Sequence, residues 1–160
     1  MKKIKFIPKS LLVNADKKLL VELLSHRQRS ENDCETGGVL MGELYPKSNK
    51  IKVTHILVCE HTNNSRYGLE LNVECLQKQM NEIWEKSNGT ITYLGDWHTH
   101  PEYIPKPSYI DYKTFLKNYY ASKFEQNFLL YIILGREQTM WFKCFNGFKF
   151  KDIIFKILED

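Results

Sequence analysis

Residues 95–111 read GDWHTHPEYIPKPSYID, and this stretch carries the strongest functional signal in the chain. Two histidines, His98 and His100, stand one residue apart at the end of a β-rich run over 90–97. Side chains two positions apart on an extended segment point to the same side. We therefore expect the two imidazoles to project together, while Thr99 faces away. This spacing suits two ligands of a single metal ion.

Asp111 follows His100 after ten intervening residues, which is enough chain to loop out and return. A carboxylate beside two imidazole nitrogens is a typical ligand set for catalytic zinc. Three protein ligands would leave the fourth position to water, whose pKa falls toward neutrality on the metal. The residues alone also allow a plainer interpretation. In that interpretation the histidine pair is a coincidence, and Ser108 simply caps a helix with Asp111 three residues later.

Outward from this stretch, the hydrophobic periodicity predicts one α+β domain over residues 1–160. Strands are expected over 3–7, 37–45, 51–59, 90–97, 128–134, 139–145 and 148–154. Helices are expected over 15–29, 71–87 and 108–121, with a loop over 61–70. Asn146 and Gly147 provide a hairpin signal between the last two strands. The predicted architecture is a mostly antiparallel sheet with two to three helices.

The composition is that of a soluble globular protein, and it argues against nucleic-acid and membrane partners. The net charge of +4 comes from 23 basic and 19 acidic residues spread along the chain, which is no nucleic-acid footprint. Neither a signal peptide nor an apolar run approaching the ~20 residues of a membrane span is visible. We therefore expect a cytoplasmic protein whose cysteines are reduced. The four cysteines are Cys34, Cys59, Cys75 and Cys144.

The segment from His98 to Asp111 reproduces the signature H-[ST]-H-P-x6-S-x2-D without a gap. In this respect the chain resembles the JAMM metalloproteases, the JAB/MPN family. That family also has a glutamate just before a small, apolar strand, and Glu35 followed by TGGVLMG looks like this element. The resemblance covers about residues 30–135. It implies a single MPN (JAB-like) domain with a curved sheet.

The resemblance also implies roles for individual residues. His98, His100 and Asp111 would hold one zinc ion. Glu35 would take a proton from the attacking water and deliver it to the leaving amine, and Ser108 would donate a hydrogen bond to the developing oxyanion. Three other acidic residues lie close to Glu35 in the sequence, and the family pattern alone selects among them. They are Glu31, Asp33 and Glu43.

Within the family, the motif region looks most like compact bacterial JAB proteins, including the deconjugase of CBASS anti-phage operons. This implies a zinc-dependent isopeptidase, similar to deubiquitinases, that cuts the amide bond after the extended C-terminal tail of a conjugated protein. In CBASS that protein is the cyclic-nucleotide synthase. Partners would include the ubiquitin-activating-like and conjugating-like enzymes of the same operon. Two alternatives stay open: a zinc hydrolase of a small-molecule amide or linear precursor peptide, and a non-catalytic MPN scaffold.

Two further features surround the motif. His55 interrupts an apolar strand and is interpreted as a core or edge histidine, whereas the CEH sequence over 59–61 could hold a second metal. Segments 61–70 and 102–106 are the expected walls of a groove for the substrate tail. The apolar side chains near the motif could line this groove in the strand-addition mode or simply cover the core. They are Tyr103, Ile104 and Tyr109.

Overall fold

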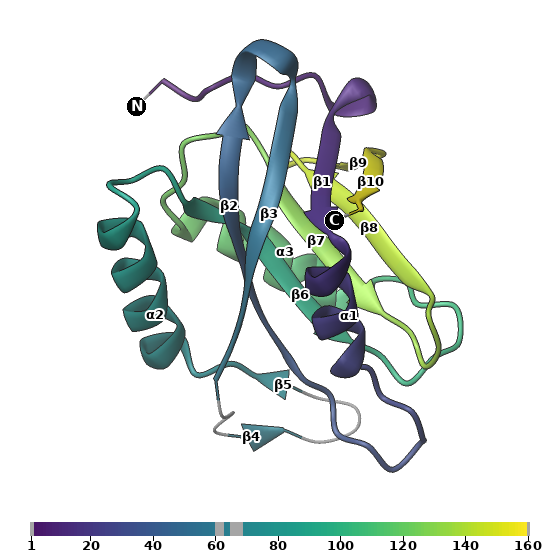
Figure 1. The fold of residues 1–160 in the computed structure, drawn as a ribbon. Helices are drawn as coiled ribbons and strands as arrows, with labels where there is room; N and C mark the ends of the chain where they lie inside the picture. Colours follow the sequence, from purple (N-terminus) through teal and green to yellow (C-terminus); the bar gives the residue numbers. More distant parts are fainter. Residues whose placement is uncertain (1, 60–62, 65–68, 160) are drawn as a thin grey trace.

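The computed structural model describes residues 2–59, 63–64 and 69–159 (Figure 1). Three α-helices lie within these ranges: α1 (Lys17–Ser25), α2 (Val73–Lys86) and α3 (Tyr109–Ala121). The strands are β1 (Leu12–Asp16), β2 (Gly37–Tyr45), β3 (Lys50–Val58), β4 (Asn63–Asn64), β5 (Leu69–Glu70), β6 (Thr92–Thr99), β7 (Leu129–Leu134), β8 (Met140–Phe145), β9 (Phe150–Lys151) and β10 (Ile154–Leu158). Short 3-10 turns, η1 (Pro8–Ser10) and η2 (Pro46–Ser48), complete the described elements.

Eight of the strands form one curled sheet in the order β10-β1-β3-β2-β6-β7-β8-β9. Neighbours pair antiparallel at β2–β3, β2–β6, β7–β8 and β8–β9, and parallel at β1–β10, β1–β3 and β6–β7. The parallel pairing of β6 with β7 requires a crossover, and α3 lies in it. The predicted α+β class with a mostly antiparallel sheet is thereby confirmed.

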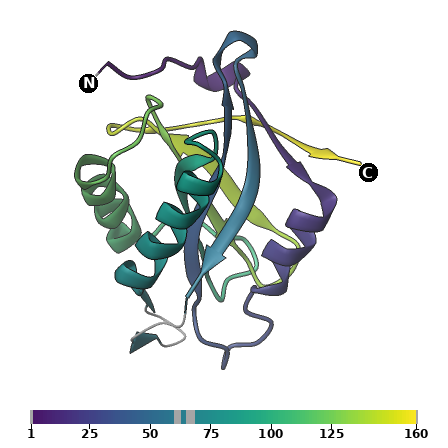
Figure 2. The ribbon, with the colours of Figure 1, turned by 60° about the vertical axis from the view of Figure 1, so that its left-hand side comes forward.

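The helices cover both faces of the sheet. In Figure 2, α2 and α3 lie together on one side and α1 lies on the other. Strand β7 shows the consequence most clearly, because all six of its residues are buried. Leu130 and Ile132 pack in the cluster on the α1 side, whereas Tyr131 and Ile133 pack in the cluster on the α3 side. A strand buried on both faces reads as a continuous apolar run, as LLYIIL does.

Glycines allow β2 to lie close to its neighbours where the functional motif begins. A Cβ atom added at Gly38 would stand 1.8 Å from the carbonyl oxygen of Leu57. One added at Gly37 would stand 2.9 Å from the Cβ of His98. Both distances are shorter than side-chain packing permits, so the glycine pair that precedes Val39 is a packing requirement.

The structure corrects three expected elements. Residues 3–7 form no strand, and only an isolated bridge joins Ile4 to Gln126. The first strand is instead β1, which lies inside the sheet between β3 and β10. Its sequence did not predict a strand because it contains the polar residues Asn14 and Asp16. The expected strand over 148–154 is divided into β9 and β10, which pair with different neighbours. Segment 61–70, expected as a loop, contains the β4–β5 pair of Asn63–Asn64 with Leu69–Glu70. Its remaining positions, 61–62 and 65–68, lie outside the described residues.

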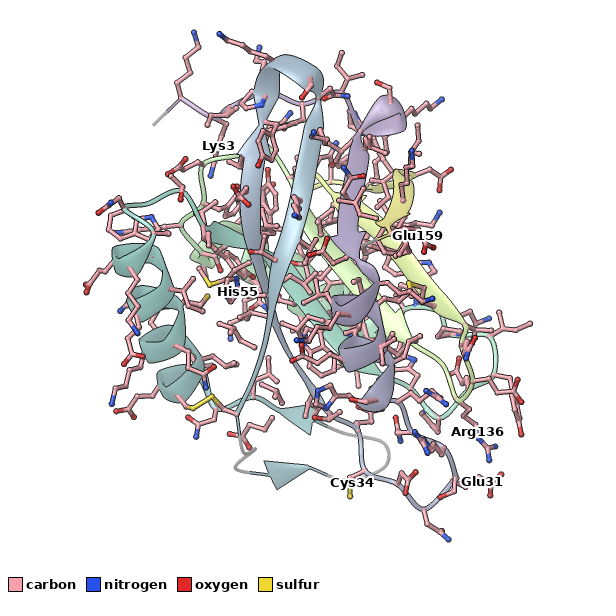
Figure 3. The ribbon with its side chains drawn as sticks, in the orientation of Figure 1. Lys3, Glu31, Cys34, His55, Arg136 and Glu159 are labelled. Carbon is pink, nitrogen blue, oxygen red and sulfur yellow. A yellow bond between two sulfur atoms is a disulfide. The ribbon has the colours of Figure 1, made fainter. Side chains whose placement is uncertain are left out.

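The cysteine expectation was wrong for one pair. Cys59 and Cys75 form a disulfide between the end of β3 and the first turn of α2 (yellow bond in Figure 3). Their Cα atoms lie 6.2 Å apart although 16 positions separate them in sequence, and no spacing rule indicates such a contact. Cys34 and Cys144 are free, the first exposed and the second buried. No helix in the described parts of the chain is long and apolar enough to cross a membrane.

Candidate metal centre and active site

The two motif histidines lie where β6 ends. His98 is in the strand, and the backbone N–H of His100 donates to the carbonyl oxygen of Leu134 at 2.9 Å, which continues the pairing with β7. Thr99 points the other way, and its hydroxyl donates to the side-chain oxygen of Gln28 at 2.9 Å. The alternation of an extended chain therefore places both imidazoles on one side, as the spacing predicts.

Asp111 comes from the first turn of α3. Its backbone N–H donates to the Ser108 hydroxyl oxygen at 3.0 Å, and its carboxylate accepts the backbone N–H of Ser108 at 2.9 Å. This reciprocal pair is a capping box, which satisfies two backbone donors that the helix start would otherwise leave unpaired. The same carboxylate faces the histidines, so the cap also fixes the position of the third candidate ligand.

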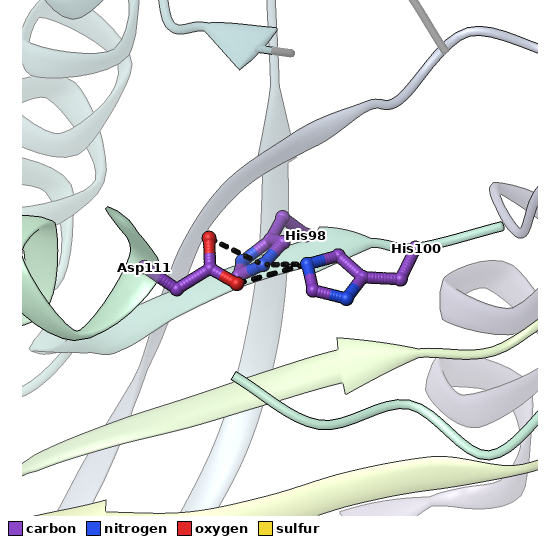
Figure 4. Close-up of side chains that lie close together, drawn as sticks. All are labelled: His98, His100 and Asp111. Carbon is purple, nitrogen blue, oxygen red and sulfur yellow. Dashed lines mark hydrogen bonds and ion pairs between the residues drawn. The ribbon is translucent and has the colours of Figure 1, made fainter. Parts of the chain in front are cut away.

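The three side chains converge on one point (Figure 4). The Nε2 atoms of His98 and His100 lie 3.1 Å apart. The carboxylate oxygens of Asp111 lie 3.4 Å from Nε2 of His98 and 2.9 Å from Nε2 of His100. Zinc bonds of about 2.0–2.1 Å in a tetrahedron place ligand atoms roughly 3.3 Å apart, and the observed triangle matches this spacing. Two facing imidazole nitrogens also need a proton or cation between them, because bare lone pairs repel.

The electrostatics of this cluster favour a bound cation. Burial alone would raise the pKa of Asp111, but hydrogen bonds from His100 and His98 hold it well below the ordinary value. Burial alone would lower the pKa of His100, but the hydrogen bond and charge of Asp111, with the charge of Glu35, raise it. The free site thus keeps the Asp111 carboxylate ionised and favours the protonated form of His100, and a divalent ion satisfies the same requirement.

Glu35 reaches this centre from a distant part of the chain. The adjacent Thr36 is fastened to Thr99, since its carbonyl accepts the Thr99 N–H at 2.9 Å and its own N–H donates to the Thr99 hydroxyl at 3.0 Å. Burial raises the pKa of Glu35 to about 7, and the negative charges of Asp111 and Glu102 add to the increase while His100 opposes it. A bound cation would also lower this pKa.

A carboxylate that titrates near neutral pH beside three converging ligand atoms is suited to proton transfer. The other acidic candidates near Glu35 are used or placed elsewhere. The Asp33 carboxylate accepts the backbone N–H groups of Arg29 and Ser30, which close a local turn. Glu43 accepts a hydrogen bond from the Tyr45 hydroxyl at the far end of β2. Glu31, labelled in Figure 3, is exposed on the loop that precedes β2.

Comparison with known proteins decides the family. The family described as prokaryotic homologs of the JAB domain matches residues 16–145. This chain belongs to that family. The match includes Glu35, both histidines, Ser108 and Asp111, so all five candidate residues lie inside this JAB domain.

Three relatives whose names state an activity extend the comparison. The chain is 34% identical over 140 residues to the CD-NTase/cGAS isopeptidase of Escherichia coli, covering 87% of this chain and 83% of that protein. Proteins of the same name from Pseudomonas aeruginosa and Vibrio cholerae are 33% and 32% identical, over 78% and 74% of this chain and 78% and 73% of theirs. The solution structure of a Desulfitobacterium hafniense protein matches with a TM-score of 0.60 at 22% identity, covering 92% of this chain and 95% of that one. That likeness concerns the fold.

Two features of this JAB centre were not expected from the motif. Glu102 places a carboxylate oxygen 3.9 Å from Nδ1 of His100, on the side of the ring that faces away from Asp111. Gln28 is fully buried and holds the segment that carries Glu35, because its side chain binds both the Thr99 hydroxyl and the carbonyl of Asp33. Glu102 directly follows the HTHP sequence and could have been found by position, whereas Gln28 carries no sequence signal.

The remaining candidates lie apart from the JAB centre or outside the described residues. The imidazole of His55 contacts the Thr54 hydroxyl on β3, and His55 is not in the group of three converging ligands. The thiol of Cys59 is consumed in the disulfide, which contradicts its use as a ligand of a second metal. Glu60 and His61 lie outside the described residues. The apolar residues near the motif do not cover the core, because they are exposed: Tyr103, Ile104 and Tyr109.

Proposed function

We propose that this JAB protein is a zinc-dependent isopeptidase that releases a CD-NTase from the protein to which its C-terminal tail is conjugated. The observation that carries the proposal is the triangle of His98, His100 and Asp111 with the Glu35 carboxylate beside it. The names of three relatives at 32–34% identity support the substrate class. A non-catalytic scaffold would have no need of the complete set of ligands and base.

Each residue has a task in hydrolysis. His98, His100 and Asp111 hold the ion, which when bound supplies Lewis acidity to a water molecule and to the scissile carbonyl. Glu35 removes a proton from the attacking water and passes it to the leaving nitrogen, which a carboxylate with a pKa near neutrality can do in both directions. The hydroxyl oxygen of Ser108 accepts the Asp111 N–H, so its proton is available to the developing oxyanion.

The substrate tail lies in an extended conformation across this centre. Leu69 of β5 lies beside Gly37 at the start of β2, and we place the walls for the tail at this flank and at segment 102–106, which is exposed apart from Pro105. Main-chain pairing along such a path would register the scissile carbonyl on the ion. The ubiquitin-activating-like and conjugating-like enzymes that form the conjugate would be partners in the same system.

A conjugate-cleavage assay tests the proposal. The last residues of a CD-NTase encoded beside this protein would be joined through an amide bond to a fluorescent reporter and incubated with the zinc-loaded enzyme. We expect cleavage directly after the tail, its loss on chelation and its recovery with zinc. Bulky replacements of the small residues near the cut should abolish cleavage, because the channel over the ion is expected to be narrow.

Equal hydrolysis of short unrelated peptides would move the assignment to a general zinc peptidase. Release of a small-molecule amide in preference to the tail conjugate would favour the alternative hydrolase. Tail binding without any turnover by the zinc-loaded protein would identify a scaffold.

A further inference from the structure

A groove lined by several lysines lies beside the candidate active site. It has a volume of about 760 Å³ and lies between the start of α3 and the β8–β9 hairpin, with Ser108 in its wall. Five lysines line it: Lys9, Lys106, Lys143, Lys149 and Lys151. None of them has a part in the hydrolysis proposed above, and only Lys106 also belongs to a proposed wall of the tail path, so their concentration here needs another explanation.

Most lysines of this basic groove form no ion pair with an acidic neighbour. Asp152 is the one acidic residue in its lining, and its carboxylate pairs with Lys143 and also feels the charge of Lys9. Among the residues that the structure describes, no ion pair involves any of the other four lysines. Like charges held together without counter-ions repel one another, and an acidic ligand relieves this repulsion.

The walls of the basic groove are held in place by the fold. Trp141 and Phe150 pack edge to face with their ring centroids 4.8 Å apart. The hydroxyl of Tyr112 donates to the carbonyl oxygen of Phe148 at 3.1 Å, which fastens α3 to the hairpin. An aromatic floor with lysines around it presents apolar contact and positive charge to the same ligand, and little ordering is required on binding.

The topology places this groove on the opposite side of the metal centre from the proposed tail path. The sheet order is β2-β6-β7-β8-β9, with the histidines at the end of β6. Leu69 and the tail path lie on the β2 side, whereas the basic groove lies over β8 and β9. A polypeptide that crosses the three ligands from the β2 side and keeps this direction would pass Ser108 and enter the groove.

We propose that the basic groove binds an acidic segment of the target protein, on the amine side of the scissile bond. This proposal rests on the proposed function, which defines the amine side of the scissile bond. The acidic character of the ligand is inferred from the lysines that form no ion pair. A polypeptide is favoured over a nucleic acid because Ser108, which we assign to the hydrolysis of an amide bond, also lines the groove. Recognition on this side would add selectivity for the target to selectivity for the tail.

Binding is tested separately from catalysis. The full-length Glu35→Gln protein, loaded with zinc, would be titrated with a fluorescently labelled glutamate-rich peptide, its glutamine counterpart and a single-stranded oligonucleotide of matched length. We expect the acidic peptide to bind best and to weaken as salt is added. The double change Lys9→Gln with Lys149→Gln should weaken binding by about 2- to 30-fold, as expected for two exposed ion pairs.

The matched control is the double change Lys78→Gln with Lys86→Gln, which removes the same charge from the exposed surface of α2. It should leave peptide binding unchanged. Equal losses in both double variants, or no preference for glutamate over glutamine, would overturn the proposal. Tighter binding of the oligonucleotide that depends on Lys9 and Lys149 would overturn it in favour of a nucleic acid.

Cleavage then separates this inference from the proposed function. Tail conjugates with acidic or neutral leaving segments would be compared by kcat/KM, and the groove variant should lose only the preference for the acidic conjugate. Conjugates cut without any acidic preference would refute the groove proposal and leave the isopeptidase proposal intact. Groove-dependent peptide binding without cleavage of any conjugate would do the reverse.

Discussion

Ser108 and Asp111 hold each other through two reciprocal hydrogen bonds of 3.0 and 2.9 Å, and the same Asp111 carboxylate lies 2.9 Å from Nε2 of His100. The start of α3 and the candidate metal centre therefore share the Asp111 carboxylate. A change at either residue acts on both the helix and the site, and the two effects can be separated only by measuring stability and rate together.

Ser108→Ala provides this separation. Losing an oxyanion donor typically lowers turnover by ~10²–10³-fold, whereas losing an N-cap costs about 1 kcal/mol of folding free energy. We expect a large fall in kcat with a small fall in Tm. Ser108→Thr keeps both the hydroxyl and the cap and should retain much of the activity. A large fall in Tm with nearly unchanged kcat would reduce Ser108 to a helix cap.

His100→Ala should remove the metal. Two remaining ligands bind zinc weakly, so metal analysis of the purified variant should fall from about one ion per chain to a small fraction. Because an ion that binds only the folded state stabilises it, the wild-type Tm should fall on chelation and the variant's Tm should not. His55→Ala is the matched control and should keep its zinc. Full occupancy in His100→Ala would refute the ligand assignment.

Glu35→Gln should keep the fold and the ion but lose nearly all turnover. General acid–base groups contribute ~10²–10⁴-fold, and a carboxylate used for both proton transfers belongs at the upper end of that range. Zinc content, Tm and kcat of the variant would be compared with those of Glu43→Gln, which changes an exposed carboxylate at the far end of β2. Near-native turnover by Glu35→Gln would send the search for the base to Glu102.

Gly38→Ala tests the close approach of β2 to its neighbours. The added methyl group would meet the backbone carbonyl of Leu57 at 1.8 Å, and backbone cannot move aside as a flexible side chain can. Overpacking costs typically 1–3 kcal/mol, and a backbone clash inside a sheet should reach at least the upper value. Chemical denaturation would show the loss as a lower midpoint with an unchanged slope. Native stability in this variant would mean that β2 and β3 can separate locally without cost.

Pattern reading succeeded where local chemistry determines the structure. Apolar runs bounded by turn residues predicted β2, β3, β7 and β8, and helical spacing predicted α2. The positions of Pro107 and Ser108 predicted the start of α3. The spacing of His98, His100 and Asp111 predicted that they converge, since an extended strand end and a capped helix start leave little choice. Their roles as ligands, and those of Glu35 and Ser108, stay predictions.

The failures came from contacts between distant segments. Strand β1 is short and carries polar residues, and only its pairing with β3 and β10 makes it a strand. Among the apolar residues of α2, Leu76 is buried whereas Val73 and Trp84 are exposed, and the range of the helix alone does not show which of them the sheet covers. The Cys59–Cys75 contact depends on how the chain returns from β3 to α2. None of these contacts has a local sequence signal.

The hydrogen bonds between Thr36 and Thr99 hold Glu35 at the metal centre, so their loss would separate metal binding from catalytic competence. The three converging side chains come from β6 and α3, which are consecutive in the chain, whereas Glu35 arrives with a segment that Gln28 and Thr99 hold by hydrogen bonds. A molecule in which residues 28–36 have detached would still bind the ion but would have no base beside it. Amide hydrogen exchange of Thr36, followed together with zinc content under mild denaturation, would resolve these two events in time. Metal content would then overstate the active fraction of a partly unfolded preparation.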